Sequence, residues 1–291
     1  MIAIVDSGST KSDWIVLKKK GEEVFRTRTI GFNPYFLDSE DIVKELKNND
    51  SLVAISDNLT HIFFYGAGCS ASHFKKIVKN ALDEVFLKSK TVVEHDLLAA
   101  AYAAYNGKPV IICILGTGSN SCYFDGSILR EETPSLSFIL GDEGSGNNLG
   151  KRLLQAYFLK KMPKHLSSAF NECYRITIDD LNKNVYKNKF ANKYLATFSR
   201  FVADYKHEPF IQKLVYESLR EFFLNQVLPY PEARSSEINF IGSVAYYYEA
   251  ILQSVAAEFY LNIGIIVQKP IDRLVQYHKL YILPDLDQVK A

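Results

Sequence analysis

One pattern occurs twice in this 291-residue chain, and it constrains the fold more than any other feature. In each copy an apolar run of strand type enters a turn of small polar residues, and a second run of strand type follows. The first turn contains Gly8-Ser9-Thr10, and the second contains Gly118-Ser119-Asn120, 110 residues further along. A strand–turn–strand unit that recurs in this way predicts two similar halves, the second beginning near Pro109.

The remaining strand and helix patterns alternate along both halves. Strands are expected at 2–5, 14–17, 24–30, 61–65, 91–94, 109–115, 122–124, 239–241 and 263–267. Helices are expected at 41–48, 72–88, 97–105, 147–161, 194–228, 244–259 and 271–278. Strands that alternate with helices predict an α/β fold, with a ligand site in the cleft between its halves. The length suits two domains, 1–107 and 108–291, with the last helix, near 271–291, free to pack back on the first.

Composition and charge exclude several classes of protein. Lysine plus arginine total 34 and aspartate plus glutamate total 33, a net charge of +1 that argues against nucleic-acid binding through a global basic field. Charges interrupt every apolar stretch before the ~20 residues that a membrane span needs. The four cysteines form no Cys-x-x-Cys pair, and Asp6 argues against a secretory signal. We therefore expect a cytoplasmic protein with reduced thiols and no nucleic-acid or membrane partner.

The two glycine-rich turns are candidate phosphate sites. A phosphate needs several backbone N–H donors at close range, which glycine permits, and serine or threonine adds hydroxyl donors. The residues concerned are Ser7, Gly8, Ser9, Thr10 and Lys11 in the first turn, and Gly116, Thr117 and Gly118 in the second. Either turn alone also suits a plain hairpin, and Lys11 alone also suits a solvated surface lysine.

Two aspartates follow strand patterns directly. Asp6, beside the first turn, could hold Mg²⁺ against nucleotide phosphates, directly or through water; an Asx-turn is the alternative. Asp96 precedes a predicted helix, where it suits both an N-cap and a general base for an alcohol. These two roles are compatible, because a helix N-terminus favours the ionised carboxylate that a base must be.

Further candidates suit sugar hydroxyl groups. The block Gly141-Asp142-Glu143-Gly144-Ser145-Gly146 places two acids between glycines, a pattern that suits sugar hydroxyls or a metal, or the start of a helix. Asn33 and Asn120 are candidate hydroxyl ligands for which a turn role is the alternative. Gly242-Ser243, at a strand end, could receive a nucleotide base.

Taken in order, these motifs resemble the sugar-kinase branch of the actin/hexokinase-like superfamily, and most closely the N-acetylglucosamine kinase-like and BadF/BadG-type ATPase families. The resemblance spans residues 6 to 245, and its most specific blocks are Gly116-Thr117-Gly118-Ser119-Asn120 and Gly141-Asp142-Glu143-Gly144-Ser145. It implies two ribonuclease-H-like, actin-like ATPase domains with a central cleft that holds ATP and Mg²⁺.

The resemblance also implies roles for single residues. The turns at 7–11 and 116–118 would bind the ATP phosphates, and Gly242-Ser243 would lie near the adenosine. Asp6 would act on Mg²⁺, and Asp96 would be the catalytic base. The sugar ligands would be Asn33, Asp96, Asn120 and Asp142, with Glu143 in the same block.

The predicted function is therefore ATP-dependent phosphorylation of an amino sugar, N-acetylglucosamine first, at its 6-hydroxyl, by a homodimer. The segment before Gly141 lacks the Gly-Trp-Gly sequence of animal members, so glucosamine, N-acetylmannosamine and muramic-type sugars stay open. Two other functions stay open as well. One is an ATPase that activates a dehydratase, which needs an iron–sulfur cluster for which these cysteines lack close pairing; the other is a non-catalytic sugar or nucleotide sensor.

Overall fold

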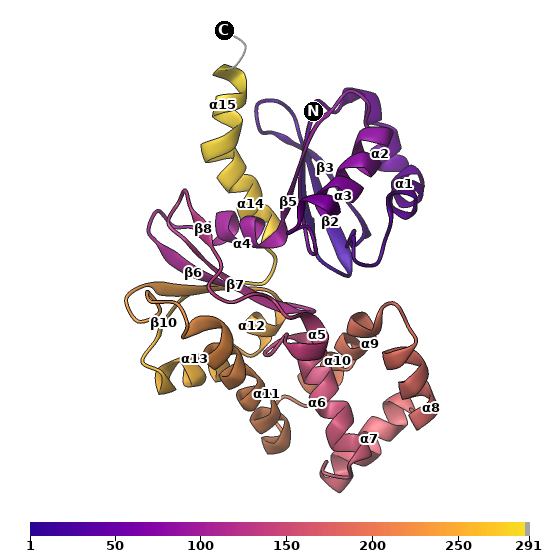
Figure 1. The fold of residues 1–291 in the computed structure, drawn as a ribbon, viewed down its shortest axis with the longest axis vertical. Helices are drawn as coiled ribbons and strands as arrows, with labels where there is room; N and C mark the ends of the chain where they lie inside the picture. The colour runs from indigo at the N-terminus through magenta and orange to yellow at the C-terminus, as the bar shows by residue number, and fades with distance from the viewer. Residues whose placement is uncertain (289–291) are drawn as a thin grey trace. The chain divides into compact units, whose positions relative to one another are not determined.

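The chain folds into two compact units, which are described in turn. The structure is a computed structural model that describes residues 1–288. The first unit comprises Met1–Ala104 and the chain from Lys269 onward, and the second comprises Tyr105–Gln268. Each unit contains a five-stranded mixed sheet with helices packed against it (Figure 1). The predicted α/β fold of two domains is confirmed.

The sheet of the first unit has the strand order β3-β2-β1-β4-β5. Its strands are β1 (Ile2–Ser7), β2 (Lys11–Leu17), β3 (Glu23–Ile30), β4 (His61–Gly66) and β5 (Lys90–His95). The first three strands form an antiparallel meander, whereas β4 and β5 run parallel to β1. The carboxyl ends of β1, β4 and β5 therefore meet at one edge of the sheet, which is where ligands bind in open α/β sheets.

Helices cover both faces of this sheet. They are α1 (Ser39–Lys47), α2 (Asp50–Val53), α3 (Ser72–Val85), α4 (Asp96–Ala104), α14 (Ile271–Tyr277) and α15 (Leu283–Gln288), with the short segments η1 (Ser56–Asn58) and η4 (His278–Ile282). The apolar sides of α1 and α3 pack on one face, against alternate residues such as Val5 and Trp14. Helices α4 and α14 contact each other and β1, so that a segment from the end of the chain completes the first unit.

The sheet of the second unit repeats this topology. Its strands are β6 (Val110–Leu115), β7 (Ser119–Phe124), β8 (Leu129–Arg130), β9 (Glu237–Ile241) and β10 (Asn262–Val267), in the order β10-β9-β6-β7-β8. Strands β6 to β8 are antiparallel, and β9 and β10 run parallel to β6. Each strand thus has a counterpart in the first unit, in agreement with the internal repeat expected from the two turns.

The helices of the second unit are more broken than the sequence pattern predicts. They are α5 (Ser137–Leu140), α6 (Gly146–Phe158), α7 (Lys164–Tyr174), α8 (Ile178–Leu181), α9 (Ala191–Thr197), α10 (Ser199–Asp204), α11 (Pro209–Phe222), α12 (Ser243–Tyr247) and α13 (Glu249–Glu258), with η2 (Asn182–Tyr186) and η3 (Phe223–Val227). The expected helical stretch 194–228 is divided, because Pro209 has no backbone N–H and begins a new helix. The expected helix 244–259 is divided at Tyr248.

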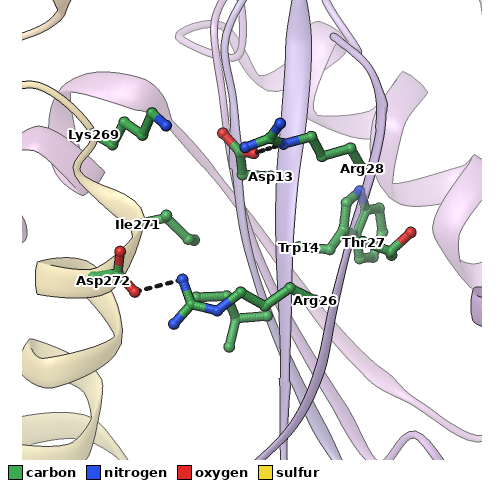
Figure 2. A pocket seen from close by; sticks show the side chains of 9 residues that line it. Asp13, Trp14, Arg26, Thr27, Arg28, Lys269, Ile271 and Asp272 are labelled. Atoms are coloured by element: carbon green, nitrogen blue, oxygen red, sulfur yellow. Dashed lines mark hydrogen bonds and ion pairs between the residues drawn. The ribbon is translucent and has the colours of Figure 1, made fainter.

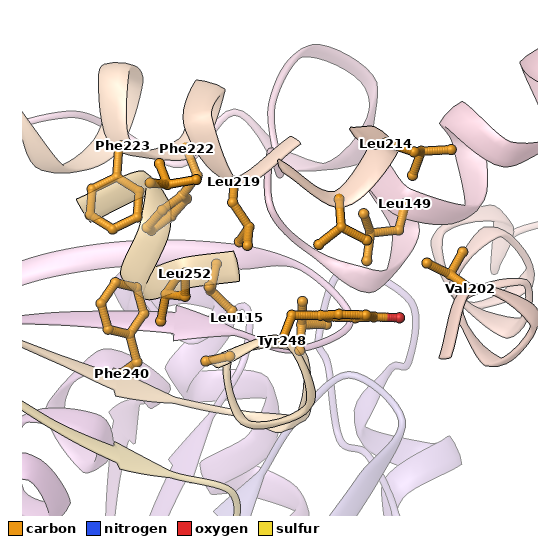
Figure 3. Close-up of a cluster of buried hydrophobic side chains, with 14 of the residues drawn as sticks. Leu115, Leu149, Val202, Leu214, Leu219, Phe222, Phe223, Phe240, Tyr248 and Leu252 are labelled. Atoms are coloured by element: carbon orange, nitrogen blue, oxygen red, sulfur yellow. The ribbon is translucent and has the colours of Figure 1, made fainter. Parts of the chain in front are cut away.

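The core of the second unit supports its candidate site. Figure 3 shows Leu219, Phe222 and Phe223 packed over Leu115 and Phe240 of the sheet. Burial of each such side chain stabilises the fold by roughly 1.5–3 kcal/mol. A Cβ on Gly144 would lie 3.1 Å from Phe222 and 3.2 Å from Leu115, so the acidic block of residues 141–146 is seated directly on this core.

The described residues contain no helix that could span a membrane, no paired cysteines and no cluster of metal-binding side chains. No helix within residues 1–288 is long and apolar enough to cross a membrane. The four cysteines are free, three of them buried and Cys173 exposed. In the same described range, His, Cys, Asp and Glu side chains form no group of three or more that could hold a metal.

Candidate active site

The first candidate phosphate turn is the exposed tip of the β1–β2 hairpin. Gly31 donates its N–H to the Thr10 carbonyl oxygen at 3.0 Å. A Cβ on Gly31 would lie 2.7 Å from the Ser9 carbonyl carbon and 2.8 Å from the Thr10 nitrogen, and closer still to the Gly8 oxygen. Real Cβ atoms do not approach backbone this closely, so only glycine fits at position 31. The turn is therefore held from behind by the segment that follows β3.

The side chain of Ser7 has a structural role in this turn. It is fully buried, and its hydroxyl oxygen accepts hydrogen bonds from Ser12 Oγ at 2.8 Å and from the Phe32 N–H at 3.0 Å. The hydroxyl thus ties β1, β2 and the segment after β3 together. Gly8 and Thr10 are exposed. Any phosphate at this turn would meet the backbone N–H groups of the exposed tip rather than the Ser7 hydroxyl.

Asn33 and Lys11 each have a partner within the first unit. Asn33 is 7% exposed; its Nδ2 donates to Ser9 Oγ at 3.1 Å, and its Oδ1 accepts from the Tyr35 N–H at 3.0 Å. Gly68 approaches this amide so closely that a Cβ there would lie 2.5 Å from Oδ1. Lys11 Nζ is paired with Asp13 at 2.5 Å. The turn role weighed for Asn33 is therefore present, and its role as a sugar ligand stays a prediction.

Asp6 and Asp96 are brought together in the first unit. Asp6 lies near the end of β1, and Asp96 directly follows β5 as the first residue of α4. Burial raises the pKa of Asp6 to about 7, and the negative charge of Asp96 adds to the rise. Two carboxylates that repel one another at a strand edge favour a cation between or beside them.

In the second unit, Asp142 joins the second turn to the acidic block. Its Oδ1 accepts from the Ser119 N–H at 3.1 Å, and its Oδ2 accepts from Asn147 Nδ2 at 2.6 Å. A Cβ on Gly118 would lie 2.9 Å from Oδ2. Burial raises the pKa of Asp142, and the bonds from Asn147 and Ser119 oppose the rise. The backbone at Asp142 has φ +60°, an uncommon value for a residue with a Cβ.

The second turn is also bonded to the start of α6. Gly146 donates its N–H to the Gly116 oxygen at 2.8 Å, and Asn147 donates to the Thr117 oxygen at 3.0 Å. Ser145 caps the helix through a bond from the Asn148 N–H at 3.3 Å. The turn, the acidic block and the helix start therefore form one bonded assembly, in which Gly118 and Gly144 leave too little room for a Cβ.

Gly242 lies beside the same turn. It directly follows β9 with φ +120°, and a Cβ there would lie 2.7 Å from the Leu115 carbonyl carbon and 3.2 Å from the Gly116 nitrogen. Only glycine allows the chain to pass this close to the turn. Ser243 begins α12 directly after it. The structure thus places the predicted adenosine-binding residues next to one of the two predicted phosphate turns.

Asn120 and Glu143 are the remaining predicted sugar ligands. Asn120 is half-buried on β7, and its Oδ1 accepts from the N–H of the neighbouring Ser121 at 2.9 Å. Glu143 Oε1 accepts from Asn225 Nδ2 of η3 at 3.2 Å. Glu143 therefore helps to attach the acidic block to the helical part of the unit, and its contact with a sugar stays a prediction.

A buried network that the sequence did not predict supports the acidic block. The fully buried Ser218 of α11 accepts from the Gly144 N–H at 3.0 Å and donates to Asn148 Oδ1 at 2.8 Å. Arg152 Nε donates to the same Oδ1 at 2.8 Å, and Arg152 also pairs with Glu221. The only sequence signal for this network was a serine on the apolar face of a predicted helix. Its side-chain partner, Asn148, lies 70 residues away in the sequence.

These features define a class of protein. Two sheets share one strand order, each carries a glycine-rich turn, and carboxylates lie beside both turns. This is the architecture of the two-domain sugar kinases and actin-like ATPases.

Comparison with known proteins identifies the family. No protein-family model matches the sequence. A protein of Porphyromonas gingivalis, named as a candidate N-acetylglucosamine kinase, has a similar structure with a TM-score of 0.90 and 37% identity, over 97% of this chain and 99% of that one. The chain therefore belongs to the N-acetylglucosamine kinase-like family of sugar kinases, as its motifs predicted.

Two other relatives are more distant. A curated N-acetylmuramic acid/N-acetylglucosamine kinase of Clostridium acetobutylicum is 27% identical over 168 residues, which are 55% of this chain and 54% of that protein. The match thus spans about half the length of that relative. A glucokinase of Streptomyces griseus, solved with glucose and AMPPNP, shares the fold with a TM-score of 0.60 at 14% identity, over 96% of this chain and 98% of that one.

Proposed function

We propose that the protein transfers the γ-phosphoryl group of ATP to the 6-hydroxyl of an amino sugar, with N-acetylglucosamine as the first candidate. The observation that supports this most is the pair of carboxylates, Asp6 and Asp96, at one edge of the first sheet. Family membership supports the reaction class, because the relatives are named as kinases of N-acetylated amino sugars.

The phosphate-binding step depends on backbone N–H groups. The exposed tip around Gly8 and the turn at 116–118 offer them in separate units, each held rigid by its own neighbours. Donors fixed before the reaction need no reorganisation as charge develops on the phosphoryl oxygens. This explains how a chain of net charge +1 can serve a highly charged substrate.

Mg²⁺ fits the first unit, because Asp6 is a carboxylate whose pKa is raised by burial and by the negative charges of Asp96 and Asp13, which a cation would offset. Bound there, Mg²⁺ would neutralise phosphate charge during transfer. Magnesium is usually held through one or two carboxylates together with substrate phosphates. Asp6 supplies such a carboxylate, and it would act directly or through water.

Asp96 is the proposed general base. Its position at the start of α4 places the positive end of the helix dipole on its carboxylate, which favours the ionised form. The base accepts the proton of the attacking hydroxyl and orients its oxygen, an effect worth about 10²–10⁴-fold in rate. Asp142, Asn120 and Asn33 are the proposed ligands of the other sugar hydroxyls, with Glu143 beside them.

One pair of variants tests the base assignment. Asp96→Asn should keep sugar affinity within a few-fold while turnover falls by about 10²–10⁴-fold. Asp83→Asn is the matched control, since Asp83 is a half-buried carboxylate of α3 that, within residues 1–288, pairs with Lys79 alone. Turnover of Asp96→Asn near the wild-type rate would remove Asp96 from the mechanism.

A panel of sugars tests the function itself. ADP release should depend on an added amino sugar among N-acetylglucosamine, glucosamine, N-acetylmannosamine and N-acetylmuramic acid. Sugar binding without turnover would instead indicate a sensor. Mass measurement in solution checks the proposed homodimer, and fractionation of source cells checks the proposed cytoplasmic location.

A further inference from the structure

A cavity of about 470 Å³ lies within the first unit, apart from its phosphate turn. It is formed by β2, β3 and the segment that begins α14 (Figure 2). This volume falls within the range of pockets that bind small molecules, about 300–1,000 Å³. The side chains that give it its chemistry are Asp13, Arg26, Arg28, Lys269 and Asp272.

Strand register explains why the charges gather there. Asp13 of β2 lies opposite Arg28 of β3, and Ile15 lies opposite Arg26. Residues two apart on a strand share a face, and directly opposed residues on antiparallel strands do too. The two arginines and Asp13 therefore project from one face of the sheet, around an apolar floor at Ile15. The chain after β10 adds the opposite wall.

The carboxylates of this cavity are already neutralised. Asp13 accepts from Arg28 Nε at 2.5 Å and pairs with Lys11 at 2.5 Å. Asp272 pairs with Arg26 at 2.6 Å, and Arg26 also pairs with Glu23. Because basic side chains already pair with Asp13 and Asp272, neither carboxylate carries an uncompensated negative charge that would attract a cation.

Two cationic groups are left for a ligand. Lys269 has no hydrogen bond or ion pair with any residue in the described part of the chain, and Figure 2 shows its amine directed across the cavity toward Asp13 and Arg28. Within residues 1–288 the guanidinium of Arg28 makes a single hydrogen bond, from Nε, so its two terminal nitrogens are open to a ligand. An arginine fork and a lysine ammonium together are a common pair for a phosphoryl group.

We propose that this cavity binds a small phosphorylated molecule, with its phosphoryl group between Lys269 and the terminal nitrogens of Arg28. The shared chemistry is a phosphoryl dianion, carried either by a sugar phosphate or by free phosphate. The volume exceeds what a bare phosphate fills. The paired carboxylates at the rim, Asp13 and Asp272, would accept hydrogen bonds from hydroxyl groups of the larger ligand.

The site would communicate with the candidate active site along one row of side chains. Asp6, Asp13 and Arg28 are directly opposite one another on β1, β2 and β3. A phosphoryl group on Arg28 would draw that cation away from Asp13 and leave more negative charge beside Asp6. Occupancy would therefore change how the first unit holds a cation, which makes the cavity regulatory.

Equilibrium dialysis without ATP or sugar acceptor tests the proposal. Radiolabelled inorganic phosphate and radiolabelled glucosamine 6-phosphate are the two probes, used at low ionic strength because screening weakens such contacts. Lys269→Met keeps the length of the side chain and should weaken binding about tenfold or more. Lys108→Met, at an exposed position of the second unit, is the matched control and should not change it.

A local signal complements the dialysis. Trp14 is the one tryptophan of the sequence and lies on β2 between the cavity residues Asp13 and Ile15, with its ring packed on the other face of the sheet. Its fluorescence should change when binding moves Asp13, in wild type and not in Lys269→Met. Tighter binding of the sugar phosphate identifies a phosphorylated sugar as the ligand, and equal binding identifies the phosphoryl group alone. Both results support the site.

Three results would overturn it. These are no binding of either probe at millimolar concentration, equal binding by wild type and Lys269→Met, or loss of binding in Thr117→Val instead. The last result would place the anion on the phosphate turn of the second unit. Since the assay contains no kinase reaction, its outcome does not depend on the proposed catalytic function.

Discussion

The glycine that shapes the first candidate phosphate turn, Gly31, lies outside the turn, and this gives a sharp prediction. Gly31→Ala should destabilise the first unit, whereas Gly8→Ala should not. A Cβ at residue 31 would meet the Ser9 carbonyl carbon at 2.7 Å, but a Cβ at residue 8 would have its nearest neighbour, the Lys11 oxygen, at 3.8 Å. The atoms around residue 31 are backbone, so no flexible side chain can move aside.

The expected magnitude follows from this geometry. Forcing one extra carbon into a closely packed place costs typically 1–3 kcal/mol. With a urea slope of about 2 kcal/mol per molar, a loss of about 2 kcal/mol lowers the midpoint of unfolding by roughly 1 M. Because alanine also pushes the hairpin tip outward, the KM for ATP should rise in Gly31→Ala while the sugar KM changes less.

Trp14 fluorescence is the assay, because this single tryptophan is buried in the first unit, on the strand that leaves the turn. Urea unfolding would be recorded for wild type, Gly31→Ala and Gly8→Ala under the same conditions. Equal midpoints for wild type and Gly31→Ala would refute the steric reasoning. So would a Gly8→Ala midpoint as low as that of Gly31→Ala.

Three further predictions concern the carboxylates and their support. Because the folded pKa of Asp6 is raised, its ionisation costs stability as pH rises from about 4 to 7; in EDTA, Asp6→Asn should therefore raise the free energy of unfolding at pH 8 and leave it unchanged at pH 4, as urea titrations would show. Asp142→Ala should raise the sugar KM more than it lowers turnover, and an unchanged KM in steady-state assays would count against it as a ligand. Ser218→Ala leaves the buried Gly144 N–H without its partner, so it should cost about 1–3 kcal/mol in urea unfolding and raise the sugar KM, and Ser218→Thr should restore both in part.

The two turns show how far the sequence could predict the structure. Short-range patterns predicted both hairpins, the α/β class and the strand ends at which Asp6 and Asp96 lie, because these depend on local alternation and on turn residues. The helical stretch predicted at 194–228 was too long, because its apolar periodicity continues across Pro209, where a new helix begins.

The supporting contacts of the site could not be predicted in the same way. Ser218 reaches Gly144 across 74 residues, and a serine on an apolar helix face carries no sign of which backbone group it bonds. Asp142 is similar, because its bond from the Ser119 N–H joins residues 23 positions apart, which the pattern of the acidic block does not reveal. Such positions are fixed by tertiary packing.

The bond from the Ser119 N–H to Asp142 has a practical consequence for anyone who redesigns this protein. The carboxylate is at once a proposed sugar ligand and a structural part of the turn next to Gly118. A library that varies Asp142 to change sugar preference should also deform the candidate phosphate turn at 116–118. Altered specificity is therefore better sought around Asn120, whose side chain bonds the neighbouring Ser121 N–H and the Glu131 side chain rather than the turn at 116–118.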